Sequence, residues 1–151
     1  MTPRFLYPAD YFDPSRPDET FAAEAAAFEA AGFGVSGIDK NALQGGRPRI
    51  RPLPSEGETI VYRGWMLAPE DYAALLEITS RTGAVPLTSL ETYLSTHYLP
   101  NWYPLIRDLT PETVVLSLEE DLASRLRELG WERFFIKDYV KSLKTSVGSM
   151  I

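Results

Sequence analysis

Apolar residues recur at helical spacing in three stretches of the chain, and each stretch ends at a glycine. The first stretch begins near Asp18, a residue type favoured at the N-cap of a helix, and ends at Gly32. Phe21, Ala25 and Phe28 are three or four residues apart and predict its buried face. Glycine suits the end of a helix because it adopts the left-handed conformation at little cost.

Two further stretches follow the same pattern. One begins at Pro69, a residue favoured in the first turn, and ends at Gly83. Its apolar stripe consists of Tyr72, Leu75, Leu76 and Thr79. The other opens with a capping box from Ser117 to Glu120 and ends at Gly130. Its leucine face consists of Leu118, Leu122, Leu126 and Leu129.

A fourth, shorter helix is predicted after Thr88, which forms a capping pattern with Glu91 and is followed by Tyr93 and His97. We expect Pro100 and the proline at position 104 to interrupt the stretch after it.

Short apolar runs between these helices predict strands. They lie at residues 4–7, 33–38, 59–63, 84–87, 113–116 and 134–139. Residues 44–53 are rich in Gly, Arg and Pro, which indicates a loop or at best an edge strand.

Alternating helices and strands predict an α/β protein of two parts. Residues 1–87 read as a small parallel-sheet unit. Residues 88–151 contain two predicted strands around one helix, and no later element covers the second strand. That strand is expected to leave an open sheet edge, through which the chain can pair with a second chain or with another copy of itself.

Composition and charge narrow the classes of function. A length of 151 residues with 44% hydrophobic residues suffices for an ordinary soluble domain with a core. The net charge is −6, although the last fifteen residues carry three lysines and one aspartate. An acidic body argues against general nucleic-acid binding, which needs a broad basic surface.

The chain contains no cysteine, which excludes disulfides, thiolate metal sites and cysteine nucleophiles. Its start has no secretory signal pattern, and no apolar run approaches the roughly 20 residues needed to span a membrane. We therefore expect a cytoplasmic protein with no membrane partner.

Lysine is rare and clustered. There are four lysines against eleven arginines, and three of the four follow the apolar run at 134–136. A hydroxyl-rich turn comes after them. The cluster consists of Lys137, Lys141, Lys144, Ser146, Gly148 and Ser149. Closely spaced ammonium groups beside such a turn are typical of a phosphate cradle, and the alternative is a solvated basic tail.

Three other groups are candidates for chemistry. Tyr62, Arg63 and Trp65 stand at the end of a predicted strand, where ligands bind in open α/β sheets. Arg63 can hold a carboxylate or phosphate there with two hydrogen bonds, or it can be an edge arginine packed on Trp65. Tyr103 belongs to a dense aromatic group that follows His97 and either bridges two subdomains or lines a ligand groove.

Arg107 precedes Asp108 and either ends a helix or reaches a phosphate. His97 is the only histidine of the chain, and without a second histidine or a cysteine no histidine-based metal site is expected. The chain has no Walker loop, no G-x-G-x-x-G after a strand and no G-x-S-x-G nucleophile elbow.

Three segments together resemble a clade of ATP-grasp proteins that is marked by an arginine and two lysines and was formerly a domain of unknown function. They read VYRGWML at 61–67, HYLPNWYPLIRDLTPETV at 97–114 and GWERFFIKDYVKSLKTSVGS at 130–149. The resemblance covers most of the chain but only the amino-terminal part of the family's length. It implies a pre-ATP-grasp α/β domain at 1–87 and the incomplete amino-terminal part of an ATP-grasp domain at 88–151.

The resemblance also assigns roles to residues. Lys137 would be the strand lysine that contacts nucleotide phosphates, with Lys141 as its companion. Arg107 would be the first nucleotide-binding basic residue. Residues 145–149 would begin the glycine-rich loop over the phosphates, with Lys144 just before it. Arg63 would lie on the substrate side with Tyr62, Trp65 and Tyr103.

The implied activity is ligation of a carboxylate to an amine through an acylphosphate, with ATP and Mg²⁺. In such enzymes the Mg²⁺ ligands and the adenine pocket lie beyond the position of Ile151. We therefore expect residues 1–151 alone to be inactive and to bind ATP weakly or not at all. The alternatives are a non-catalytic interaction module that pairs through its open sheet edge, and a stand-alone phosphate-ligand enzyme of another kind.

Overall fold

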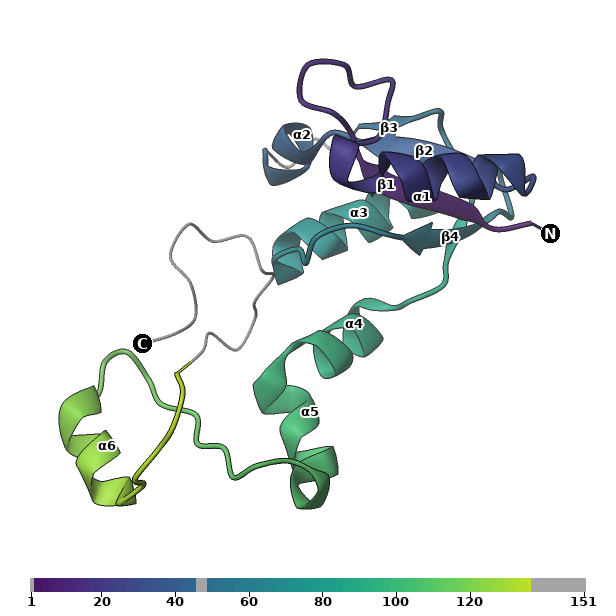
Figure 1. Ribbon diagram of the computed structural model, residues 1–151. Helices are drawn as coiled ribbons and strands as arrows, with labels where there is room; N and C mark the ends of the chain where they lie inside the picture. The colour runs from purple at the N-terminus through teal and green to yellow at the C-terminus, as the bar shows by residue number, and fades with distance from the viewer. Residues whose placement is uncertain (1, 46–48, 137–151) are drawn as a thin grey trace. The chain divides into compact units, whose positions relative to one another are not determined.

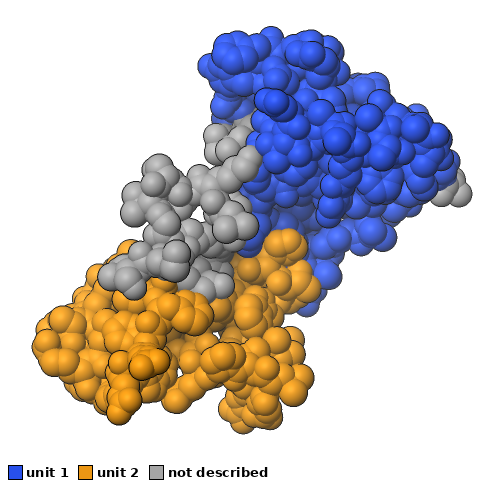
Figure 2. Space-filling view, in the orientation of Figure 1, with its two compact units in different colours: residues 1–93 blue, residues 94–151 orange. Residues whose placement is uncertain are grey.

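The computed structural model describes residues 2–45 and 49–136. The chain divides into two compact units, residues 1–93 and residues 94–151, which Figure 2 shows in separate colours.

The first unit is built on a five-stranded sheet of order β3-β2-β1-β4-β5 (Figure 1). Its strands are β1 (Arg4–Pro8), β2 (Gly34–Ile38), β3 (Ile50–Arg51), β4 (Thr59–Tyr62) and β5 (Val85–Pro86). All neighbours pair in parallel except β2 and β3, which are antiparallel. The predicted α/β class is confirmed. For the Gly-, Arg- and Pro-rich segment at 44–53, a loop or an edge strand was predicted, and β3 is that edge strand.

Helices cover both faces of this sheet. The first unit contains α1 (Glu19–Ala30), α2 (Lys40–Gln44), α3 (Pro69–Arg81) and the start of α4 (Leu90–His97). Phe5 of β1 stacks on Phe28 of α1 with ring centroids 3.8 Å apart, whereas Tyr62 of β4 packs on Tyr72 of α3. Tyr62 pairs in register with Leu6, the neighbour of Phe5. Because adjacent strand residues point to opposite faces, α1 and α3 lie on opposite faces (Figure 1).

Helices α1 and α3 begin and end close to the capping residues and glycines that predicted their bounds. The Asp18 side chain accepts a hydrogen bond from Thr20 N at the start of α1, and Pro69 occupies the first turn of α3. Gly83, just after α3, has a φ of 76°, which other residues rarely adopt. The core of the unit forms where the two apolar helix faces meet the sheet. Its fully buried side chains are Leu6, Tyr7, Ser36, Ile38, Leu43, Leu75 and Thr79.

The second unit contains the end of α4, then α5 (Leu99–Ile106), a short 3₁₀ turn η1 (Arg107–Leu109) and α6 (Leu122–Leu129). The expected interruption at the prolines is wrong. Pro100 falls in the first turn of α5, where no backbone N–H is needed, and Pro104 lies inside the helix two residues before its end. The proline pair therefore limits the length of this helix without preventing it.

Two predicted helix starts are also wrong by a few residues. Ser117 N donates to Glu120 Oε1 at 2.8 Å, but this capping pattern closes a turn and does not begin a helix. Helix α6 begins after Asp121, whose side chain accepts from Ser124 N. Similarly, Ser89 rather than Thr88 accepts from the backbone at the start of α4. Both starts lie beside several residues able to cap, and local spacing does not choose among them.

The strands predicted at 113–116 and 134–136 do not form, and residues 137–139 of the second one lie outside the described residues. A strand needs a neighbour for its backbone hydrogen bonds and a layer against its apolar side chains. In the described part of the second unit, residues 94–136, Tyr98 is the only buried side chain. No core is present there on which these two segments can assemble a sheet.

Candidate functional site

The carboxyl ends of β1, β2 and β4 meet at one edge of the sheet. The chain passes from β1 to β2 on one side, and later places β4 on the other side of β1. This reversal creates a topological switch point between β1 and β4, the position at which open α/β sheets bind ligands. Arg63 directly follows β4 and therefore lies at this position.

Glu24 of α1 fixes the Arg63 side chain. Arg63 Nε donates to Glu24 Oε1 at 2.8 Å, and Arg63 Nη2 donates to Glu24 Oε2 at 3.1 Å. The fully buried Tyr7 donates to Glu24 Oε1 at 3.0 Å. These hydrogen bonds, those from Arg63 first, lower the pKa of Glu24, and burial raises the pKa of Tyr7. The three side chains form a network with one full positive and one full negative charge.

Arg63 retains donor capacity beyond this network. A guanidinium carries five N–H groups, and two of them are used by Glu24. The Arg63 side chain is 52% exposed. Its remaining donors can therefore bind an incoming carboxylate or phosphate oxygen, in an orientation that Glu24 has already set.

Tyr62 and Trp65 shape the turn that carries Arg63. Tyr62 Oη donates to the Trp65 carbonyl at 2.8 Å, and the Trp65 ring meets Phe21 of α1 edge-on at 5.0 Å. A Cβ on Gly64 would overlap the Tyr62 hydroxyl and the Pro8 ring, so any larger residue in this turn would have to displace them. Burial raises the pKa of Tyr62. Through these contacts the two aromatic side chains hold the backbone around Arg63.

The other predicted site residues divide into two groups. Tyr103 and Arg107 belong to the second unit. Tyr103 Oη accepts from Thr113 N at 3.1 Å, and Arg107 is 70% exposed with Asp108 Oδ1 at 3.6 Å from its Nε. The phosphate-cradle residues lie outside the described residues; they are Lys137, Lys141, Lys144, Ser146, Gly148 and Ser149.

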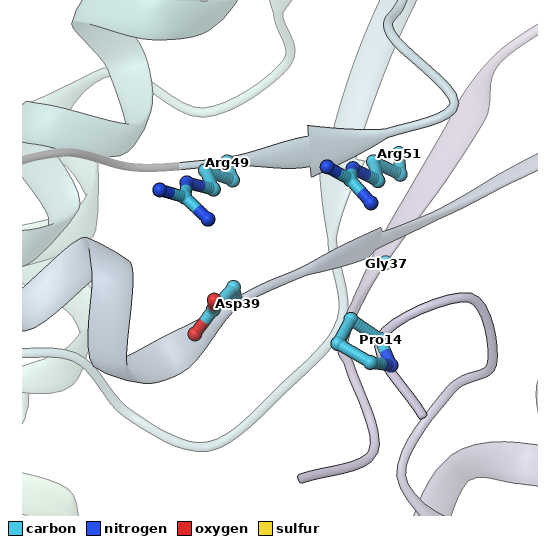
Figure 3. A pocket seen from close by; sticks show the side chains of 5 residues that line it. All are labelled: Pro14, Gly37, Asp39, Arg49 and Arg51. Carbon is cyan, nitrogen blue, oxygen red and sulfur yellow. The ribbon is translucent and has the colours of Figure 1, made fainter. Parts of the chain in front are cut away.

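A second group of charges at the same sheet edge was missed by the sequence analysis. Asp39, Arg49 and Arg51 line a small pocket together with Pro14 and Gly37 (Figure 3). The alternation Arg49-Ile50-Arg51 was a usable signal, because it puts both arginines on one face of a strand. Glu24 had no such signal, since only the packing of α1 on the sheet brings it to Tyr7 and Arg63.

Among residues 2–45 and 49–136, no three side chains of His, Asp or Glu come together to hold a metal ion. None of the helices in this part of the chain combines the length and apolar character that crossing a membrane requires.

Comparisons with protein families, curated proteins and solved structures gave no match to this chain. What the site can do therefore follows from its own geometry and chemistry.

Proposed function

We propose that this chain is the amino-terminal part of an ATP-grasp-like, ATP-dependent carboxylate–amine ligase. The observation that carries the proposal is the position of Arg63 at the switch point of the doubly wound sheet. A carboxylic acid substrate is recognised well by an arginine whose orientation is fixed and whose outer donors remain available. The resemblance in three segments supplies the nucleotide side of the same proposal.

In this proposal the first unit binds the acid and the second unit contributes to the nucleotide site. Arg63 donates to the substrate carboxylate, and Glu24 with Tyr7 keeps the guanidinium in place. Lys137 and Lys141 contact the phosphates of ATP, with Arg107 as a further basic contact. ATP supplies the phosphoryl group that activates the acid, and Mg²⁺ ligands are expected from polypeptide other than the described residues.

Exposed apolar side chains in the second unit support the view that residues 1–151 are inactive alone. Leu109 and Leu118 are 86% and 91% exposed, and Phe135 is 73% exposed. Such side chains normally pack against further structure. We infer that additional polypeptide completes the unit and, with it, the nucleotide site.

Titration with Mg-ATP followed by calorimetry tests the nucleotide site. For residues 1–151 we expect a dissociation constant of about 1 mM or weaker. Supplying the completing polypeptide, in the same chain or as a separate one, should tighten it. The double variant Lys137→Ala/Lys141→Ala should then lose most of the affinity, whereas Lys40→Ala, which removes the fourth lysine, should not. Equal ATP binding by the double variant would refute the assigned phosphate cradle.

Trapping with hydroxylamine tests the reaction class in the completed protein. An acylphosphate reacts with hydroxylamine to give a hydroxamate and inorganic phosphate, so formation of a hydroxamate that depends on ATP identifies acid activation. Arg63→Ala should raise the KM for the acid because it removes a substrate contact. ATP consumption without any hydroxamate, across a panel of acids, would argue against the ligase.

The second candidate function is that of a non-catalytic interaction module. The exposed apolar side chains of the second unit favour this function too. The β5 edge of the observed sheet offers no free N–H for pairing through strands. Val85 N of β5 donates to the carbonyl of Glu58, just before β4, and Leu87 N, just after β5, donates to the carbonyl of Ile60 in β4. Pro86 between them has no N–H to offer a partner strand. A concentration-dependent increase in mass by light scattering, without any ATP binding by the completed protein, would favour this module.

A further inference from the structure

The pocket between β2 and β3 is a second candidate site, separate from Arg63. It lies on the carboxyl side of β2, and its lining residues are Pro14, Gly37, Asp39, Arg49 and Arg51 (Figure 3). The strand order places β3 three positions away from β4. With about 4.8 Å between neighbouring strands, the pocket is on the order of 14 Å from Arg63.

The strand register explains why three charged side chains meet here. Gly37 is paired with Arg51, and Asp39 N donates to the Arg49 carbonyl at 3.1 Å. Gly37, Asp39, Arg49 and Arg51 therefore all face the same side of the sheet. Gly37 has no side chain, which leaves open space beside Arg51. The loop at Pro14 closes one side, because the Pro14 carbonyl would lie 3.4 Å from a Cβ on Gly37.

Neither guanidinium group forms an ion pair with another described residue, although the Asp39 carboxylate lines the same pocket. Within residues 2–45 and 49–136, no carboxylate lies within ion-pair distance of Arg49 or Arg51. Both side chains are exposed. Two like charges on one face of a short strand repel each other, and an anion between them removes that repulsion. In a chain of net charge −6, two neighbouring arginines that form no ion pair with a described residue point to an anionic ligand.

Asp39 selects which anion fits. Its Oδ1 accepts from Ala42 N at 3.0 Å, which holds the carboxylate in place at the start of α2 and leaves Oδ2 for a ligand. An ionised carboxylate only accepts hydrogen bonds, so it repels a fully deprotonated anion such as sulfate. Hydrogen phosphate keeps a P–OH near neutral pH, and this group can donate to Asp39 while the other oxygens accept from the arginines.

The volume of the pocket agrees with a small ligand. It is about 50 Å³, compared with the roughly 10–15 Å³ that one water needs on the same measure. We propose that Arg49, Arg51 and Asp39 form a binding site for hydrogen phosphate that distinguishes phosphate from sulfate. This site does not depend on the proposed ligase activity or on the lysine cluster.

Titration of the whole chain with inorganic phosphate at low ionic strength, followed by ³¹P NMR, tests the site. Arg49→Gln/Arg51→Gln should weaken phosphate binding by at least about tenfold, because two charged hydrogen bonds are lost. The control Arg81→Gln/Arg125→Gln removes the same charge from exposed ion pairs elsewhere and should leave the affinity within about twofold. Circular dichroism checks that each variant keeps its fold.

Titrations with sulfate and with a phosphate monoester test which anions the site accepts. Sulfate, and phenyl phosphate above its second pKa of about 6, have no proton to donate and should bind more weakly than inorganic phosphate. Asp39→Asn keeps a good N-cap for α2 and removes the repulsion, so it should bring sulfate close to phosphate.

Three results would overturn the proposal. The first is no saturable phosphate binding by the unmodified chain up to about 10 mM, and the second is equal binding by Arg49→Gln/Arg51→Gln. The third is equal binding of sulfate and phosphate before Asp39 is changed. Lys137→Ala/Lys141→Ala should retain phosphate binding, and its selective loss in that variant would place the phosphate at the lysine cluster instead.

Discussion

Glu24 accepts three hydrogen bonds at the carboxyl edge of the sheet, two from Arg63 and one from Tyr7. At the scale of residues, this carboxylate determines how Arg63 is presented. Without it, a half-exposed arginine at the end of a strand would sample many rotamers. With it, the guanidinium is oriented before a ligand arrives.

The pH dependence of stability should report this network. The hydrogen bonds from Arg63 lower the pKa of Glu24 in the folded state. Its contribution is therefore present above the ordinary glutamate pKa of about 4.3 and is lost as the pH falls through the folded value. Because both side chains are over a third exposed, we expect only about 0.5–1 kcal/mol from the pair at neutral pH. Urea unfolding of Glu24→Gln should show this loss at neutral pH and a smaller one near pH 4.

Glu77→Gln is the matched control, since Glu77 forms an exposed ion pair with Arg81 within α3. It should change the pH profile less than Glu24→Gln does. An unchanged difference between the Glu24→Gln variant and the parent chain across this pH range would show that the pair contributes no pH-dependent stability.

At the scale of elements, Tyr93 connects α4 to the turn after β4. Its hydroxyl accepts from Leu67 N at 2.7 Å and donates to the Leu67 carbonyl at 3.1 Å. Its ring stacks on Tyr72 of α3 with centroids 3.8 Å apart. One side chain thus joins two helices to the segment that carries Arg63.

Tyr93→Phe removes only the hydroxyl oxygen, yet it should destabilise the first unit substantially. Tyr93 is only 3% exposed and Leu67 is also buried. Loss of the Tyr93 hydroxyl therefore leaves the N–H and the carbonyl of Leu67 without this partner. We expect a decrease of about 1–3 kcal/mol in the free energy of unfolding, measured by urea denaturation of the first-unit signal. Tyr11→Phe, at a residue that is 75% exposed, is the control and should have little effect. Equal effects of the two changes would contradict the bridging role of the Tyr93 hydroxyl.

At the scale of the whole molecule, the two units have unequal cores. The first unit holds nearly all buried apolar side chains, and in the described part of the second unit only Tyr98 is buried. Hydrophobic burial is the main favourable term in folding, so the second unit has much less to stabilise it. The units are therefore not expected to unfold as one cooperative system.

Hydrogen exchange followed by mass spectrometry should reveal this difference. Backbone amides of β1 and α3 should exchange through opening of the whole first unit, whereas those of α6 should exchange far faster. Addition of the completing polypeptide should slow exchange in α6 and leave β1 unchanged. Equal protection of α6 and β1 in the chain alone would contradict the inferred lack of a second core.

Local signals in the sequence determined most of the first unit. Asp18, Pro69 and the glycines after each helix fixed the bounds of α1 and α3, because capping and the left-handed conformation depend on adjacent residues. Short apolar runs predicted β1, β2 and β4, and the end of the predicted β4 pointed to Arg63. These features require no knowledge of distant contacts.

Only the tertiary structure decided the partners of the site. Glu24 meets Tyr7 across 17 positions and Arg63 across 39, and an antiparallel register places Arg49 and Arg51 in one pocket with Asp39. In the second unit, equally good apolar segments at 113–116 and 134–136 did not become strands. A helix forms its hydrogen bonds within its own segment, whereas a strand and a site depend on segments that folding must bring together.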